Sequence, residues 1–243
     1  MDKTDRMKLG VIGGLGPLAT AAFLEMVIKM TDASCDQEHL EMIIYNYPSI
    51  PDRTSYILGR SNENPVIPMI EIGQKLVSQG VDYLVIPCIT AHYFYRELAE
   101  ALDKPIINIL EQTALHLKAC GVRTAGIAAT DGTLASRIFQ KALDDQHIKS
   151  VVPSETMQKR VMELVYDDVK AGRPVHLDKF GEMSLELRKN GAEAIVLGCT
   201  ELSLIKRDYP IGAGYLDAMD VLAQASVLAC RRPLKKQYAR LIT

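Results

Sequence analysis

The chain has 243 residues, and its 28 Lys and Arg residues against 30 Asp and Glu give a formal net charge of −2 at pH 7. Hydrophobic residues make up 48% of the sequence and charged residues 24%, which is ordinary for a folded protein and excludes global disorder. The near-neutral charge predicts neither nucleic acid nor an anionic membrane surface as a partner. No run of about 18 apolar residues is present, so we expect no transmembrane helix.

The five cysteines are scattered along the chain without a C-x-x-C spacing. An odd number of widely spaced cysteines favours neither a disulfide framework nor a zinc site, so we expect free thiols and no metal. The short charged segment Met1–Lys8 leads into an apolar run that glycines soon interrupt, which is not the pattern of a secretory signal. We therefore expect a cytoplasmic protein.

The first half of the chain alternates short β-rich runs with longer helical segments. Apolar runs of this kind, buried on both faces, are what a parallel sheet flanked by helices requires. The predicted strands are Lys8–Ile12, Met42–Tyr47, Tyr83–Ile86 and Pro105–Ile109. The predicted helices are Pro17–Thr31, Val66–Ser78, Tyr93–Leu102 and Glu111–Ala119. The pattern predicts βαβ units.

The same rhythm restarts after Gly121. The predicted strands are Thr124–Ala129, Ser150–Val152 and Ala194–Leu197, and the predicted helices are Leu134–Leu143, Glu155–Ala171, Leu177–Lys189 and Asp217–Cys230. We therefore predict an α/β fold of two pseudo-symmetric lobes, each a mostly parallel sheet flanked by helices. The lobes are residues 1–114, to which the C-terminal segment 213–243 returns, and residues 115–212. The active site is expected in the cleft between them.

Two of the apolar strands end in the same way, at Cys88 and at Cys199, and each cysteine is followed by a threonine and then a helix. Functional groups of α/β sheets collect at the carboxyl ends of strands, and a helix N-terminus favours a thiolate. Two such thiols can remove an α-proton from one face of a substrate and return one to the other face, without a cofactor. We interpret the remaining cysteines as small packing residues.

Four segments carry a resemblance to a known family. Pro87–His92 resembles the P-C-N-T-A-H motif of the aspartate/glutamate racemase superfamily, and Gly198–Leu202 resembles its G-C-T-E motif. Gly13–Thr20 is similar to the family's G-G-x-G-P-x-A-T loop, and Ile50–Thr54 to its I-P-D-R-T segment. The resemblance spans the whole chain in the same order. It implies a homodimeric, cofactor-independent racemase of a small amino acid, aspartate or glutamate.

The resemblance also implies roles for individual residues. Cys88 and Cys199 are the expected proton-transfer residues. Thr90 and Thr200 are expected to bind the α-carboxylate or the amino group, and Thr130 is expected to line the same substrate pocket. Arg53 and Lys170 are expected to bind the side-chain carboxylate of the substrate, for which an Arg offers a bidentate fork. Glu201, in the second motif, is expected to support the site.

Two further residues are candidates from the local pattern. Pro17 suits the first position of a helix, so the loop containing Gly14 is expected to approach a small anion of the substrate with its backbone amides. His92 lies one helical turn after Cys88, where it can influence the protonation of the thiol or pack as a structural residue.

Ile89 stands where the family has asparagine, which leaves substrate recognition open. The alternatives are a related dicarboxylate isomerase or decarboxylase on the same scaffold, and an inactive amino-acid-binding protein. The glycine loop also fits the dinucleotide pattern G-x-G-x-x-A. The acidic residue expected after the second strand of such a site is missing, so a nicotinamide enzyme is a weak alternative.

Overall fold

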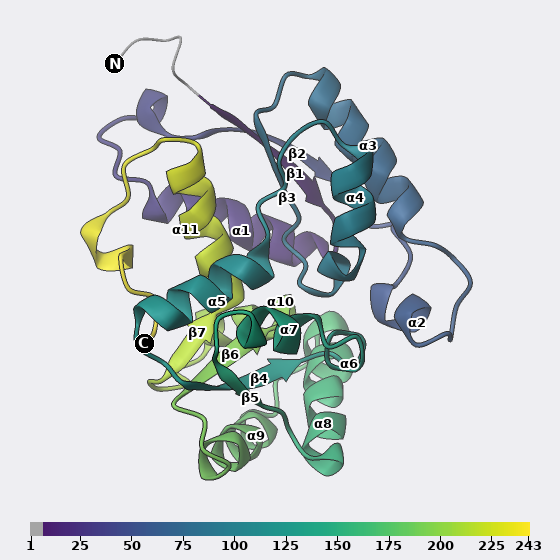
Figure 1. Ribbon diagram of the computed structural model, residues 1–243, viewed down its shortest axis with the longest axis vertical. Coiled ribbons are helices and arrows are strands. Elements are labelled where there is room, and N and C mark those ends of the chain that lie inside the picture. Colours follow the sequence, from purple (N-terminus) through teal and green to yellow (C-terminus); the bar gives the residue numbers. More distant parts are fainter. Residues whose placement is uncertain (1–6) are drawn as a thin grey trace.

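Two parallel sheets flanked by helices lie one above the other in Figure 1, a computed structural model that describes residues 7–243. The prediction about a signal sequence in Met1–Lys8 therefore falls largely outside the described residues. The sheets have the predicted architecture, with two lobes of similar topology.

The first sheet contains three parallel strands in the order β2-β1-β3. Their bounds are β1 Lys8–Gly13, β2 Glu41–Asn46 and β3 Tyr83–Val85. The helical segments around it are α1 Pro17–Met30, η2 Asp36–Glu38, α2 Arg53–Ile57, α3 Val66–Ser78, η3 Thr90–Phe94, α4 Tyr95–Ala101 and α5 Ile109–Ala119. Strand β1 lies in the centre and is buried almost throughout, which is why its sequence reads as a continuous apolar run.

The second sheet repeats this arrangement in the order β5-β4-β6 and adds β7 at one edge. Its strands are β4 Thr124–Ala129, β5 Lys149–Val151, β6 Ala194–Gly198 and β7 Tyr215–Asp217. The helical segments are α6 Asp131–Ala135, α7 Ile138–Asp144, α8 Glu155–Met162, η4 Glu163–Lys170, α9 Leu177–Lys189, α10 Thr200–Asp208, α11 Ala218–Ala229 and η5 Lys236–Tyr238. Strands β3 and β6 therefore hold equivalent places, and each runs into one of the two candidate cysteines.

Three predicted elements differ in the structure. The segment Pro105–Ile109 is not a strand: it makes one isolated bridge, Leu84 to Ile106, because the Asn108 side chain caps α5 and starts the helix there. The helix predicted over Leu134–Leu143 is split into α6 and α7 by Arg137, whose φ is +56°. The helix predicted over Glu155–Ala171 changes from α to π geometry at Glu163.

The C-terminal segment 213–243 is divided between the lobes. Strand β7 pairs with β6 in the second sheet, whereas α11 packs against α1 and α5, as Figure 1 shows. Helix α11 thus lies against helices α1 and α5, while the strand before it belongs to the second sheet. One hydrophobic cluster runs from Leu9 in β1 to Ala125 in β4, so the lobes share a continuous core.

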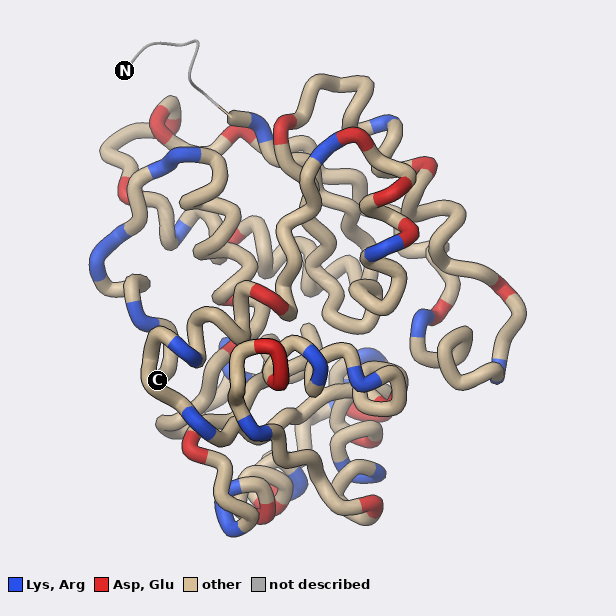
Figure 2. Tube along the Cα trace, viewed as in Figure 1, with Lys and Arg blue, Asp and Glu red and all other residues tan. Residues whose placement is uncertain are grey.

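Both signs of charge occur on both lobes in Figure 2. The C-terminal segment is the exception, because its charged residues after Asp220 are all basic: Arg231, Arg232, Lys235, Lys236 and Arg240. Within residues 7–243, no helix is long and apolar enough to cross a membrane. The expected lack of a nucleic-acid partner stays a prediction.

Candidate active site

A small cavity lies between the two sheets, and both candidate cysteines line it. One lobe contributes the end of β3 and the start of α2, and the other the starts of α6 and α10 together with η4. The lining residues are Leu15, Asp52, Arg53, Thr54, Cys88, Ile89, Thr90, Thr130, Tyr166, Lys170, Cys199, Thr200 and Glu201.

Cys199 caps the N-terminus of α10 and is 5% exposed. Its Sγ donates to Oε2 of Glu201 at 2.7 Å, and the Thr200 hydroxyl donates to the same oxygen at 3.0 Å. Burial, together with the negative charge of Glu201, raises the pKa of the Cys199 thiol well above its usual value. The expected lowering by the helix N-terminus is therefore outweighed, and Cys199 is held as a thiol.

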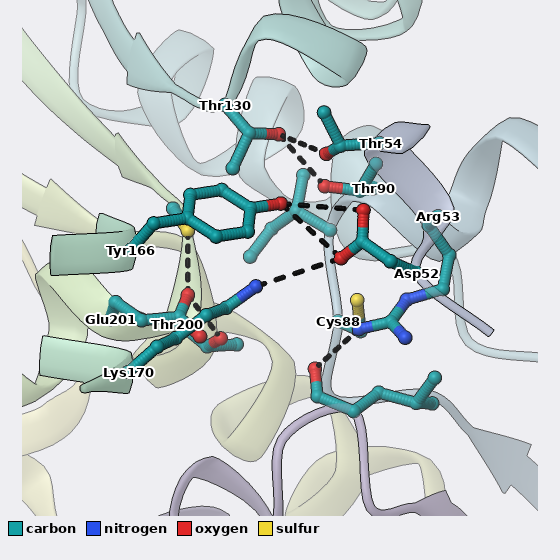
Figure 3. Close-up of a pocket in the computed structure, with 13 residues that line it drawn as sticks. Asp52, Arg53, Thr54, Cys88, Thr90, Thr130, Tyr166, Lys170, Thr200 and Glu201 are labelled. Atoms are coloured by element: carbon teal, nitrogen blue, oxygen red, sulfur yellow. Dashed lines mark hydrogen bonds and ion pairs between the residues drawn. The ribbon is translucent and has the colours of Figure 1, made fainter. Parts of the chain in front are cut away.

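Cys88 has different surroundings. It precedes a short 3₁₀ helix rather than an α-helix, and the neighbouring charged group is the Arg53 guanidinium, which is 9% exposed. Burial disfavours the charged form of Arg53. The neighbouring Cys88 and Asp52 outweigh this effect and raise the pKa of the guanidinium. The two cysteines are therefore not equivalent: a cation lies beside Cys88 (Figure 3), and a carboxylate lies beside Cys199.

Backbone carbonyls fix the position of Arg53. Its Nη1 donates to the carbonyl oxygens of Pro51 at 3.0 Å and Ile50 at 3.3 Å, and its Nη2 donates to that of Leu15 at 3.5 Å. The Nε atom is buried and makes no hydrogen bond to the described residues. The guanidinium is also within hydrogen-bonding reach of the Cys88 side chain, so Arg53 meets the cavity at this thiol.

Four threonine hydroxyls join the lobes beside the cavity, and three of them, Thr54, Thr90 and Thr130, line it. Thr130 lies 3.4 Å from Thr54 and 3.1 Å from Thr90, measured between Oγ1 atoms, and Thr133 is within 3.1 Å of both Thr90 and Thr130. All four side chains are buried. Because a hydroxyl both donates and accepts, this cluster can turn its donors toward a substrate carboxylate. Thr54 and Thr133 were not among the predicted site residues.

The opposite wall is formed by Tyr166 and Lys170, which η4 presents toward Asp52 of the other lobe (Figure 3). The Tyr166 hydroxyl donates to Asp52, 3.2 Å from Oδ2, and Lys170 Nζ lies 3.8 Å from the same oxygen and 3.9 Å from the Tyr166 ring centre. Burial works against the charge of Lys170, but Glu201 and Cys199 raise its pKa. π-Helical turns of this kind are rare and often mark functional sites.

Two predicted site residues do not line the cavity. The amide of Gly14 donates to Oγ1 of Thr20 at 2.9 Å and is not free for an anion. The φ of Gly14 is +94°, and a Cβ there would lie 2.4 Å from the carbonyl carbon of Tyr47, so a glycine is required for close backbone approach.

His92 acts on the backbone that carries Cys88, not on its thiol. Its Nε2 accepts from the amide of Ile109 at 3.4 Å, so Nδ1 carries the proton and donates to the Cys88 carbonyl oxygen at 3.0 Å. Burial lowers the pKa of His92 from 6.5 to about 4. The ring is thus neutral near pH 7 and positions the loop, which favours the structural interpretation.

We expect His92 to make unfolding sensitive to acid. Its pKa is lower in the folded state than the ordinary 6.5, so its contribution is complete above pH 6.5 and is lost as the pH falls toward 4. The expected loss is about 3 kcal/mol of the free energy of unfolding. Urea unfolding from pH 7 down to pH 4 measures it. The free energy of unfolding of His92→Gln should fall less steeply over this range, and identical slopes would contradict the prediction.

The sequence model of the Asp/Glu/Hydantoin racemase family matches residues 12–226. This span includes every residue that lines the cavity. The chain belongs to the Asp/Glu/Hydantoin racemase family. The predicted resemblance is thereby confirmed, and so is the expectation of an amino-acid racemase at the level of the family.

Several relatives are similar over nearly the whole chain. The broad specificity amino-acid racemase RacX of Bacillus subtilis is 27% identical over 225 residues, which cover 90% of this chain and 96% of that protein. The aspartate racemase of Picrophilus torridus is 31% identical, with a TM-score of 0.82 over 96% of this chain and 97% of the other. Glutamate racemase from Francisella tularensis, solved in complex with D-glutamate, shares the fold at 17% identity, with a TM-score of 0.66 over 93% of this chain and 81% of that one.

Sequence reasoning missed some lining residues. Asp52 was visible as part of the I-P-D-R-T segment, and its position directly before Arg53 was the available signal. Tyr166 carried no signal, because it lies in the middle of a predicted helix and reaches the cavity through the π-helical turn. Ile89 lines the cavity as well, so the departure from the family motif lies at the site.

Proposed function

We propose that the protein racemises an amino acid without a cofactor, by two-base proton transfer between Cys88 and Cys199. The observation that carries the proposal is that these two strand-end thiols, from equivalent places in two lobes, line one small cavity. Membership of the racemase family supports it.

The unequal neighbours of the thiols suggest how the cycle starts. Arg53 provides a positive charge for a Cys88 thiolate, and Glu201 accepts a hydrogen bond from the Cys199 thiol, which keeps its proton. The Cys88 thiolate removes the proton from the α-carbon on one face, and Cys199 gives its proton to the other face. One proton leaves the substrate and one returns, so Cys88 ends as thiol and Cys199 as thiolate. Racemisation of the opposite enantiomer follows the same steps in reverse, beginning with the Cys199 thiolate and the Cys88 thiol.

Negative charge that develops on the α-carboxylate needs fixed donors. The threonine cluster of Thr54, Thr90 and Thr130 supplies them at one wall of the cavity. Preorganised donors of this kind stabilise an enolate-like state most strongly where water is excluded, and the cysteines are almost completely buried.

An acidic substrate, aspartate or glutamate, is the form of the proposal that the cations support. Arg53 and Lys170 line the same cavity. Lys170 has only a long 3.8 Å contact with Asp52, so its ammonium is available to a side-chain carboxylate. The 31% identical relative is an aspartate racemase, which supports aspartate as the first substrate to test.

Proton NMR in D₂O tests the proposal. With aspartate or glutamate of either configuration, we expect loss of the α-proton signal together with loss of optical activity. Loss of CO₂ or isomerisation of a dicarboxylate, without racemisation, would favour the alternative chemistry on this scaffold. Binding without exchange of the α-proton would favour the inactive binding protein. A homodimer in the cytoplasm is the assembly and location that accompany the proposal.

A further inference from the structure

A second cavity, of about 510 Å³, lies behind α10. It is bounded by α1, by α10, by the junction of β7 with α11 and by Tyr238, in the region where α1 and α11 lie side by side in Figure 1. Among the described residues it shares no lining residue with the first cavity. Ser203, Lys206 and Arg207 of α10 face it, since i, i+3 and i+4 positions share one helix face. The proposed racemase mechanism does not use this cavity.

The floor of this rear cavity contains a buried carboxyl group. Asp217 is 1% exposed, and its Oδ1 accepts from the Ser203 hydroxyl at 2.7 Å and from the amide of Met219 at 2.9 Å. Within residues 7–243, both of these hydrogen bonds end on the same oxygen, which leaves Oδ2 uncommitted. Burial, and then the charge of Asp220, raises the pKa of Asp217 to about 7. A donor or a cation in the cavity would satisfy this carboxylate.

The rim of the cavity carries the opposite charge. Lys29 and Arg207 stand there, each with a carboxylate neighbour, Glu25 at 2.5 Å and Asp208 at 2.6 Å. Each cation keeps further N–H donors, because an ammonium has three and a guanidinium five. Deeper in the cavity, Lys206 is paired with Asp220 at 2.7 Å and is less available.

Apolar side chains lie between floor and rim. Met26 and Met30 of α1 line one side and Tyr238 the other. Thioethers and an aromatic ring make an adaptable apolar wall. The cavity thus has a carboxylate at its floor that can pair with a cation, and two cationic side chains at its rim that can pair with an anion. An apolar wall adjoins both.

We propose that the rear cavity binds a free amino acid with an uncharged side chain as an effector. Its ammonium would pair with Asp217, its carboxylate with Lys29 and Arg207, and its side chain would pack on Met26, Met30 and Tyr238. A dicarboxylate fits less well, because its second carboxylate would face Asp217 and Asp220. Binding in the rear cavity is independent of the first cavity, whereas the effector role rests on the proposed racemase activity.

The cavity is connected to Cys199 through α10. Ser203 hydrogen-bonds Asp217 and lies 3.5 Å from the carbonyl oxygen of Cys199, within the first turn of the helix. An ammonium group bound to Asp217 would weaken the hydrogen bond from Ser203 to this carboxylate. It would thereby change the hydrogen bonding in the first turn of α10, next to Cys199. Since allosteric couplings are commonly about fivefold or more, we expect occupancy to change the racemase kcat by about that factor.

Titration calorimetry with L-methionine and L-leucine, at up to about 10 mM to reach millimolar dissociation constants, tests the binding. Binding should persist when aspartate saturates the first cavity, and Asp217→Asn should weaken it by tenfold or more, on the order of one lost charged contact. Asparagine retains an oxygen for Ser203 and Met219, so the variant should fold. No binding, displacement by aspartate, or unchanged affinity in Asp217→Asn would each overturn the proposal.

A second pair of variants protects the test against misfolding. Lys29→Glu reverses a rim charge on a side chain that is 60% exposed and should weaken binding. Arg96→Glu is the control, because Arg96 also forms an exposed i,i+4 pair, with Glu100, and lies outside the cavity. Equal affinities of the two variants would count against the site. Binding without a change in the rate of racemisation would overturn the effector role.

Discussion

Cys88→Ala and Cys199→Ala should each lower the rate of racemisation by about 10²- to 10⁴-fold, the range for loss of a general acid or base. Each thiol is the only cysteine on its side of the cavity, and neither can take over the proton transfer of the other. Both side chains are buried, so the substitution should cost about 1 kcal/mol of stability and leave the fold intact. Chiral chromatography of products and thermal unfolding measure the two effects.

The variants should also differ in what they still do. In D₂O, Cys199→Ala should exchange the α-proton of one enantiomer without inversion, and Cys88→Ala that of the other, because each retains one base. Cys35→Ala, at an exposed thiol that does not line the cavity, is the control and should behave as wild type. Full racemase activity in either active-site variant would refute the two-base mechanism.

Arg53→Met is expected to have the second-largest effect, a loss of about 10²- to 10³-fold in kcat/KM. The substitution removes the cation beside Cys88. It also removes the donors to the carbonyl oxygens of Leu15, Ile50 and Pro51, each worth about 1–3 kcal/mol if left buried and unpaired. We therefore expect a lower melting temperature as well as lower activity.

The rate of alkylation by iodoacetamide separates the two contributions of Arg53, because only the thiolate reacts. Alkylation of Cys88 should be slower in Arg53→Met, while that of the exposed Cys35 should not change. Arg53→Lys is the matched variant: it retains the charge but loses the fork to the carbonyls. It should recover the alkylation rate more fully than the stability. If Arg53→Met leaves the reactivity of Cys88 unaltered, the proposed thiolate partner is wrong.

Much of the fold could be predicted because burial imposes a pattern. Strands of a parallel sheet are covered on both faces and read as short apolar runs, so β1, β4 and β6 were found within one residue of their bounds. The amphipathic helices α3 and α9 have the predicted limits. Errors occurred where local chemistry overrides the pattern, as at the Asn108 cap and at the left-handed Arg137.

The family motifs marked much of the site, because residues next to a strand end are fixed in space by their position along the chain. Cys88, Thr90, Cys199 and Glu201 all line the cavity. Gly14 and His92 belong to the same motifs but serve the backbone, Gly14 by its positive φ and His92 by its bond to the Cys88 carbonyl. A motif does not distinguish a residue that holds a loop from one that touches a ligand.

The sequence by itself determined the α/β architecture, the family and the two thiols, since these depend on hydrophobic periodicity and on neighbours along the chain. Only the tertiary structure decided the charge beside each thiol: Arg53 for Cys88, and for Cys199 a Glu201 side chain turned back onto its sulfur. It also brought Tyr166 and Lys170 across the lobes to Asp52. Coulomb interactions fall off with distance and strengthen with burial, and both quantities are set by packing between residues far apart in the chain.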